Sequence, residues 1–390
     1  MKRDLHRERS FGLGESLRSG IRKQLKMKQL IICLLLVLGA LRLDAQDPQF
    51  SQFDANPLYY NPAAAGEANG TRMGVNYRNQ WLTTPGKSFP GPVSTYDAFT
   101  DFALKNLVVG GIGFNLLQDI EGEGRLKYTT MGLFYSWHTP TGTENFNLYF
   151  GTRLSYNFLT VDYSQFTFSD QLDPELGIVN PTMFQPGQQG NVQYFDVDVG
   201  VKTQANITDW WSMEIGYSVA HLVRPDVSLS GIETLLPIKH TFQTDQSFAI
   251  IEDKFFLVPK YLFQAQDQFK THVFGTTLYV TNRTYIWNRP IYTKPIYIGL
   301  YYRSRKFTPQ SNTNSFIFTL GNTGLMGKNN WQYQVGVSYD VDIKGLTFRP
   351  GGSLEFSFTV LIPHEATKLI NKNKRWKTCP TYNGNPLGTF

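Results

Sequence analysis

The sequence predicts an all-β fold, namely a transmembrane antiparallel β-barrel of about 14 strands. Three observations support this prediction. Apolar residues alternate with polar ones, the alternating segments have the length of membrane-crossing strands, and short connections alternate with long ones. The alternation is clearest in 331–342 and 352–362. Successive side chains of a strand point to opposite faces, so each segment has one apolar and one polar face.

From Thr71 onward, the alternation predicts one strand after another, mostly about 9–14 residues long, as a tilted strand needs to cross a bilayer. Pro259 and Pro295 lie inside two of the segments and weaken those two, because proline removes a ladder donor. The predicted strands are 71–80, 93–103, 107–117, 125–138, 145–160, 193–205, 211–222, 239–251, 254–265, 269–281, 292–303, 314–321, 331–342 and 352–362.

The connections support closure into a barrel of 70–362. Short turns at 104–106, 206–210 and 252–253 contrast with long connections at 81–92 and 161–192. Short turns on one rim and long loops on the other are typical of outer-membrane barrels. With an even number of strands, this places both ends of the barrel on the short-turn side, in the periplasm.

Two alternatives have the same alternation. A secreted β-sandwich binding module would bury its apolar faces between two sheets, and a general outer-membrane porin or solute channel would keep an open lumen. Aromatic residues near the segment ends favour a membrane barrel, because such barrels carry aromatic girdles at both interfaces. These residues are Trp81, Trp137, Trp211, Trp287 and Trp331.

Both ends of the chain lie outside the predicted barrel. Residues 1–45 read as a leader with a secretory signal, its true start at Met27 and its cleavage after Ala45. Lys plus Arg and Asp plus Glu each number 27 in 46–390, so nothing indicates a nucleic-acid partner. We expect 363–390 to be a basic periplasmic tail, either disordered or a docking segment.

The sequence predicts no enzyme, no cofactor and no metal site. It contains none of the G-x-S-x-G, C-x-x-C and H-E-x-x-H motifs. The glycines of 110–113 lie in a strand pattern with no following helix, which fits a crowded lumen better than a nucleotide loop. The histidines are scattered, and Asp170, Asp173 and Glu175 have no recognised calcium spacing.

Charged residues on the polar faces are the candidates for the barrel lumen. A charge facing lipid at mid-depth costs roughly 2–4 kcal/mol, so we expect these side chains to point inward. They would either form an ion-pair network or line a passage. They are Arg153, Asp196, Asp198, Lys202, Glu214, Asp340 and Glu355.

Residues 46–69 precede the first strand and show no lasting period. We expect them to form a plug or to pack on the periplasmic rim. Phe53, Tyr59 and Tyr60 are the residues expected to contact the lumen or a partner.

Several segments together resemble the PorP/SprF family of type IX secretion system membrane proteins: 46–66, 74–81, 94–99, 169–173, 200–222 and the late pair Cys379–Pro380. The resemblance covers essentially the whole mature chain, although Asp54 and Ala55 depart from the hydrophobic residue expected there. It implies an outer-membrane barrel that works with other type IX secretion components. It further implies a client such as a gliding adhesin, which the system secretes or anchors at the surface, and a peptidoglycan-binding, OmpA-like lipoprotein as partner.

Overall fold

The computed structural model describes most of the predicted barrel and the segment before it. The described residues are 47–68, 70–80, 93–104, 110–122, 126–139, 146–173, 175–183, 191–229, 233–251, 255–286, 289–308, 311–326, 331–344 and 352–363. The leader and the basic tail after Pro363 lie outside the described residues, as do Trp81 and Trp287. Contacts divide the chain into Met1–Asp47 and Pro48–Phe390, and the second unit contains the barrel.

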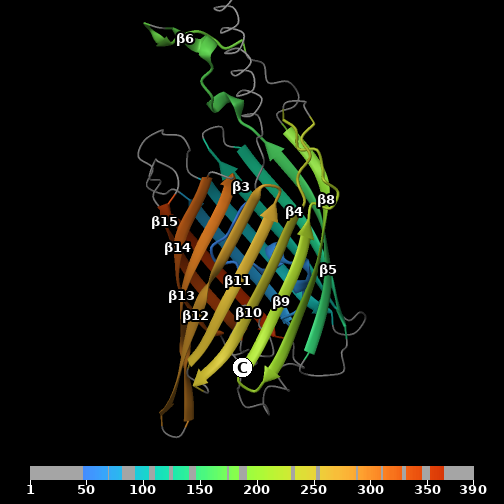
Figure 1. Ribbon diagram of the computed structural model, residues 1–390, viewed down its shortest axis with the longest axis vertical. Helices are drawn as coiled ribbons and strands as arrows, with labels where there is room; N and C mark the ends of the chain where they lie inside the picture. The colour runs from blue at the N-terminus through green and yellow to red at the C-terminus, as the bar shows by residue number, and fades with distance from the viewer. Residues whose placement is uncertain are drawn as a thin grey trace, which may run out of the picture. The chain divides into compact units, whose positions relative to one another are not determined.

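The described strands form one closed antiparallel barrel, in which each strand pairs with its neighbours in the chain and β1 pairs with β16 (Figure 1). The strands of the barrel are β1 (Gly70–Gln80), β2 (Val93–Leu104), β3 (Gly110–Glu121), β4 (Leu126–Thr139), β5 (Phe146–Thr160), β8 (Asn191–Thr208), β9 (Trp211–Ala220), β10 (Lys239–Ile251), β11 (Phe255–Gln266), β12 (Phe269–Ile286), β13 (Arg289–Thr308), β14 (Ser311–Met326), β15 (Trp331–Lys344) and β16 (Ser353–Pro363).

The predicted barrel of 14 strands is confirmed, and each predicted segment corresponds to one strand. The β-sandwich alternative is therefore wrong. The largest differences are in β13 and β14, which are longer at both ends than predicted. Pro295 lies where the β12–β13 register shifts, between the pairs Val280–Ile296 and Asn282–Thr293. A bulge accommodates a residue that has no N–H to donate, so this proline does not end the strand.

The two faces of the wall differ in the way that a membrane barrel requires. On β1, Arg72 and Arg78 point inward and are fully buried, whereas Met73 and Val75 point outward and are about half exposed. Leu133, Phe195 and many other large apolar side chains are exposed on the outer wall as well. A closed barrel leaves no unpaired strand edge, and its outer face is apolar. A protein with both properties is stable in lipid.

Within the described residues, no helix has the length and apolar character needed to cross a bilayer.

Two more short strands, β6 (Leu172–Asp173) and β7 (Gly177–Ile178), pair with each other in the long connection between β5 and β8. They project beyond the barrel at its upper end in Figure 1. This rim, which carries the long connections, is called the long-loop rim below, and the opposite one the short-turn rim.

Candidate functional site: the lumen and its inner segment

Residues 48–68, which precede β1, lie inside the barrel. We call Pro48–Ala68 the inner segment; it contains helix α2 (Pro57–Tyr60) and the 3-10 helix η1 (Pro62–Ala64). At its start, Gln49 Nε2 donates to Thr271 Oγ1 at 2.9 Å, next to the β11–β12 connection of the long-loop rim. Near its end, Ala64 O accepts from Arg72 Nη2 at 2.9 Å, close to the short-turn rim. The segment therefore passes along the lumen.

The local structure of the inner segment follows from its prolines and asparagines. Pro57 and Pro62 each begin a helical turn, where the missing N–H costs nothing. Asn61 lies between the two turns, and its Oδ1 accepts from Ala63 N at 2.9 Å, which caps η1. Its Nδ2 donates to Val201 O on the wall at 3.0 Å. One side chain thus shapes the segment and attaches it to β8.

Small residues allow the inner segment to touch the wall directly. Ala63, Ala64 and Ala65 are completely buried. A Cβ at Gly111 would lie 2.3 Å from Ala65 O, and one at Gly151 would lie 2.2 Å from Ala63 N. Such distances leave no room for a side chain, so these lumenal glycines are required for the close approach of two backbones.

Aromatic residues of the inner segment form an apolar core in the lumen. Phe50, Phe53 and Tyr60 are at most 4% exposed and pack with wall residues such as Leu262 and Tyr301. The rings of Phe53 and Tyr301 meet edge to face at 5.8 Å. Tyr59 is only partly buried, and Lys239 Nζ lies 4.8 Å from the centre of its ring. Apolar burial therefore holds the segment in addition to its polar contacts.

A cluster of charges holds the end of the inner segment nearest β1. Glu67 Oε1 lies 3.3 Å from Arg72 Nη1, and Glu67 Oε2 lies 2.7 Å from Lys202 Nζ. Each cation also has a carboxylate on the wall, Asp101 for Arg72 at 2.8 Å and Glu214 for Lys202 at 2.5 Å. We call these five residues the Glu67 cluster.

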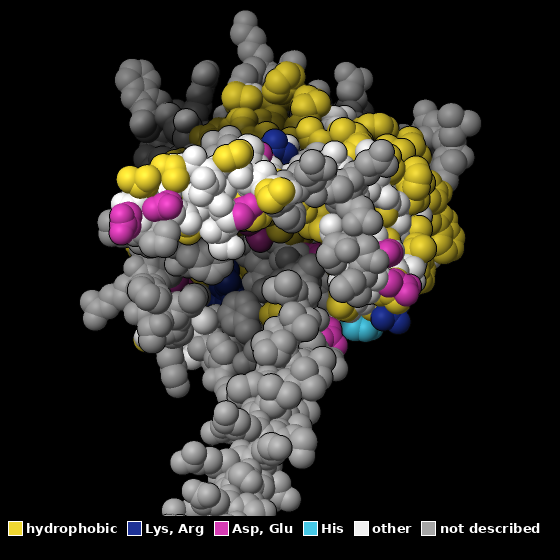
Figure 2. Space-filling model, turned by 90° about the horizontal axis from the view of Figure 1, so that it is seen from above, with side chains coloured by type: hydrophobic (Ala, Val, Ile, Leu, Met, Phe, Trp, Pro, Cys, Tyr) yellow, Lys and Arg dark blue, Asp and Glu magenta, His cyan; other side chains and the backbone are white. Residues whose placement is uncertain are grey.

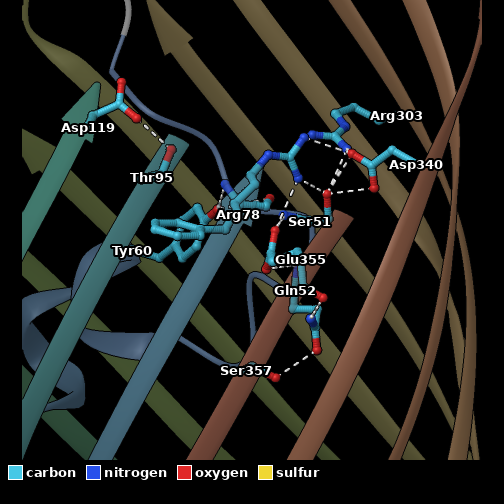
Figure 3. A network of polar contacts seen from close by, with 11 residues as sticks. Ser51, Gln52, Tyr60, Arg78, Thr95, Asp119, Arg303, Asp340, Glu355 and Ser357 are labelled. Atoms are coloured by element: carbon cyan, nitrogen blue, oxygen red, sulfur yellow. Dashed lines mark hydrogen bonds and ion pairs between the residues drawn. The ribbon is translucent and has the colours of Figure 1, made fainter. Parts of the chain in front are cut away.

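A second cluster surrounds the start of the inner segment (Figure 3). Ser51 N and Gln52 N donate to the two oxygens of Glu355 at 2.6 and 2.9 Å, and Ser51 Oγ donates to Asp340 at 2.7 Å. Arg78 bridges the two carboxylates, at 2.8 Å from Asp340 and 3.1 Å from Glu355.

Arg303 completes this cluster, because it pairs with Asp340 and donates to Ser51 Oγ at 2.9 Å. We call the six residues the Ser51 cluster: Ser51, Gln52, Arg78, Arg303, Asp340 and Glu355. The segment contributes no charge to it.

Between the two clusters, Asp54 pairs with Lys260 of β11. Lys260 Nζ also lies 3.7 Å from Asp245 Oδ2. Asn56 Nδ2 donates to Asp97 Oδ2 at 2.7 Å. Asp54 thus places a carboxylate beside a buried lysine, and the next residue, Ala55, is completely buried.

A third group of charges lies on the inner wall, apart from these two clusters. His221 Nδ1 lies 2.5 Å from Asp196, and His221 N donates to Asp198 at 3.1 Å. One ligand atom from each of the three lies within 4.8 Å of the others, which is the donor set of a divalent transition metal. Arg153 Nη1, however, lies 3.1 Å from Asp198, so the positive charge that a metal ion would bring to this carboxylate is already present.

The seven lumenal candidates thus fall into three places. Lys202 and Glu214 belong to the Glu67 cluster, and Asp340 and Glu355 to the Ser51 cluster. Arg153, Asp196 and Asp198 belong to the group with His221. Of the candidates in the inner segment, Phe53 and Tyr60 are buried in the lumen and Tyr59 is partly so.

Sequence reasoning missed several residues of these clusters. Arg72, Arg78 and Arg303 have a signal in the sequence, because they lie on the polar face of alternating strands. Lys260 has none, since apolar residues flank it on both faces of β11. Glu67, Ser51 and Asp54 lie in a stretch without a period, so no pattern distinguishes them.

Residues 43–360 match the family model described as type IX secretion system membrane protein PorP/SprF. No curated protein matches the sequence.

Solved structures similar to the chain include the CymD monoaromatic hydrocarbon channel, with 11% identity, 78% of this chain and 91% of that one covered, and a TM-score of 0.43. A Pseudomonas aeruginosa FadL homologue has 13% identity, 78% and 93% coverage and a TM-score of 0.42. The NanC porin has 9% identity, 75% and 98% coverage and a TM-score of 0.34.

Proposed function

We propose, since the chain belongs to the PorP/SprF family of type IX secretion system membrane proteins, that it is a non-enzymatic outer-membrane component of that system. Its role in this proposal is to secrete or anchor surface proteins such as gliding adhesins. The barrel would act as a membrane-embedded partner of the export machinery, and exported chains would not pass through its lumen.

The filled lumen is the observation that carries this proposal. The inner segment is attached at both rims through the Glu67 and Ser51 clusters, and aromatic residues fill the space between them. An unfolded polypeptide in transit would need that space. A barrel whose lumen is occupied by its own chain is better suited to bind a partner protein than to let an exported polypeptide pass through.

The same observation opposes the porin alternative. Fourteen strands enclose a lumen wide enough for water unless side chains or a segment fill it. Here Phe50, Phe53 and Tyr60 lie across it, all nearly inaccessible to solvent. Steady solute flux would require the segment to leave, and that would expose this apolar surface.

The proposal includes a location and partners. The leader at 1–45 would direct export, and the apolar outer wall would place the barrel among outer-membrane lipids. Other type IX secretion components and an adhesin-like client are the proposed partners. A peptidoglycan-binding, OmpA-like lipoprotein at the short-turn rim is proposed as a further one.

The test is to delete the gene and compare surface proteins of mutant and parent by mass spectrometry of shaved cells. We expect specific large surface proteins to be lost from the mutant and restored by the wild-type gene. An unchanged surface with reduced uptake of small solutes would contradict the proposal and favour a porin. In planar bilayers we expect the purified barrel to show no steady conductance, and a variant lacking 47–66 to conduct.

A further inference from the structure

The connection between β5 and β8 displays apolar side chains to water on the long-loop rim. Its described part, residues 161–173 and 175–183, contains the β6–β7 pair, and we call it the β6–β7 loop. Leu176 is 74% exposed, Ile178 63% and Met183 89%. Phe166, Leu172 and Val179 are between about two-fifths and half exposed. The β6–β7 pair lies beyond the barrel and therefore outside its lipid-facing wall (Figure 1).

Hydrogen bonds give the β6–β7 loop a defined structure. Asp173 Oδ1 accepts from Glu175 N at 2.8 Å and from Leu176 N at 2.9 Å. Asp170 Oδ2 accepts from Met183 N at 2.6 Å, which closes the loop on itself. Val179 N donates to Gln171 O at 3.1 Å. The apolar side chains are thus held outward by an ordered backbone, which is unfavourable in water unless another molecule covers them.

The charge of the loop limits which molecule that is. Between Arg153 and Lys202 the sequence has no lysine or arginine, whereas Asp162, Asp170, Asp173 and Glu175 lie in the loop. Seen from above, acidic and apolar side chains lie next to each other on the described part of this rim (Figure 2). Segments that lie on lipid carry lysine and arginine to meet anionic headgroups. The β6–β7 loop has the opposite charge, so a membrane surface does not suit it.

We propose that the β6–β7 loop is a docking surface for a segment of an exported protein in which basic and apolar side chains lie together. Apolar residues of that segment would cover Leu176, Ile178 and Met183. Its lysines or arginines would meet Glu175 and the neighbouring carboxylates. This inference rests on the proposed function, because it assumes that an exported protein reaches the long-loop rim. Complementary charge would speed the encounter, and apolar burial would slow release.

The binding test uses the full chain in nanodiscs and a synthetic 12-residue peptide of alternating lysine and valine. A glutamate–valine peptide and a lysine–serine peptide are the controls. We expect the lysine–valine peptide to bind, and the double variant Leu176→Ser/Ile178→Ser to weaken binding at least tenfold. Glu175→Lys should weaken peptide binding more at low salt than at high salt. Val223→Ser changes an exposed apolar residue of the neighbouring β9–β10 connection and should have no effect.

Three results would overturn the inference. The first is no binding of the lysine–valine peptide, the second is equal binding of the glutamate–valine peptide, and the third is equal binding by the wild type and the double variant. Phosphatidylglycerol vesicles provide the comparison with lipid. If the double variant lost vesicle binding and kept peptide binding, the loop would be a membrane contact.

A cellular measurement separates this inference from the proposed function. We expect a strain carrying Leu176→Ser/Ile178→Ser to lose the surface proteins that the gene deletion loses. If the deletion removes them and the double variant displays them normally, the docking surface is wrong while the function stands. If the deletion removes none of them, the function itself is wrong.

Discussion

The two ends of the inner segment are attached to the barrel by different chemistry. In the Glu67 cluster the segment contributes a carboxylate, which pairs with Arg72 and Lys202. In the Ser51 cluster it contributes backbone N–H groups and one hydroxyl, which bind carboxylates that arginines already neutralise. One end is therefore held by ion pairs and the other by hydrogen bonds from neutral groups.

This difference indicates which end can leave the wall at lower cost. Without the segment, the Ser51 cluster keeps two arginines in contact with two carboxylates, so no charge is left unpaired. The Glu67 end is also continuous with β1 through Gly70. At the other end, release separates the buried Glu67 carboxylate from Arg72 and Lys202, and the loss of partners by a buried charge is strongly unfavourable. We expect the start of the segment to detach before its end.

Removing the shared cation of the Glu67 cluster should have the largest effect. In Lys202→Met, Glu67 and Glu214 lose the lysine that lies between them, and the free energy of unfolding should fall by about 3–5 kcal/mol. Urea titration in detergent, followed by the electrophoretic shift of the folded barrel, measures it. Lys127→Met, an exposed lysine of β4, is the matched control. A loss no larger than that of the control would contradict the importance of this cluster.

Removing the carboxylate of the segment should cost less. In Glu67→Gln, Arg72 keeps Asp101 and Lys202 keeps Glu214, so we expect a loss of about 1–3 kcal/mol. The same titration measures it, with Glu175→Gln in the exposed loop as control. If Glu67→Gln cost no more than Ser51→Ala, the ion pairs of Glu67 would not hold this end more firmly, and the comparison of the two ends would fail.

Ser51→Ala should affect the other end alone. The hydroxyl contacts Asp340 and Arg303, and its loss should cost about 1 kcal/mol, the usual net value of a hydrogen bond. Hydrogen exchange with mass spectrometry should show faster exchange in 47–53 and unchanged exchange in 62–68. Equal acceleration in both stretches would mean that the segment moves as one unit.

Acidification should have the smallest effect, and this effect should be confined to the β6–β7 loop. Hydrogen bonds from Glu175 N and Leu176 N lower the pKa of Asp173 below its ordinary value. A lowered pKa stabilises the loop above the ordinary pKa of aspartate, and this stabilisation is lost as the pH falls through the lower, folded value. Nuclear magnetic resonance of the Leu176 amide should therefore show the loop intact at pH 5 and altered only in strong acid. A change near neutral pH would disagree with this assignment.

The sequence predicts the barrel well because alternation reports directly on which face meets lipid. On β1, β15 and β16 the polar residues point inward and the apolar ones outward, so pattern and structure agree. On β11 the inward residues include Phe256, Val258 and Leu262, because they pack against aromatic and small residues of the inner segment. Alternation is lost there, and Lys260 cannot be recognised as a lumenal charge.

The location of the inner segment is beyond pattern analysis for a different reason. Its turns are short, and its contacts with Glu355, Asp340 and Thr271 join residues more than two hundred positions apart. Such contacts depend on the closed barrel and leave no local period. Composition indicates a non-strand element with many aromatic residues, and only the tertiary structure shows what those aromatic residues touch.

The course of the inner segment restricts how the barrel can assemble. Its first described residues lie by the long-loop rim, whereas Pro363, the last residue of β16, pairs with Gly70 at the opposite rim. A segment enclosed in this way must either be in place before β1 pairs with β16 or enter the barrel after it has closed. The long loops of an outer-membrane barrel face the outside, so an epitope inserted after Pro48 should be detected by antibody on intact cells. The barrel would then present the start of its inner segment to the exterior.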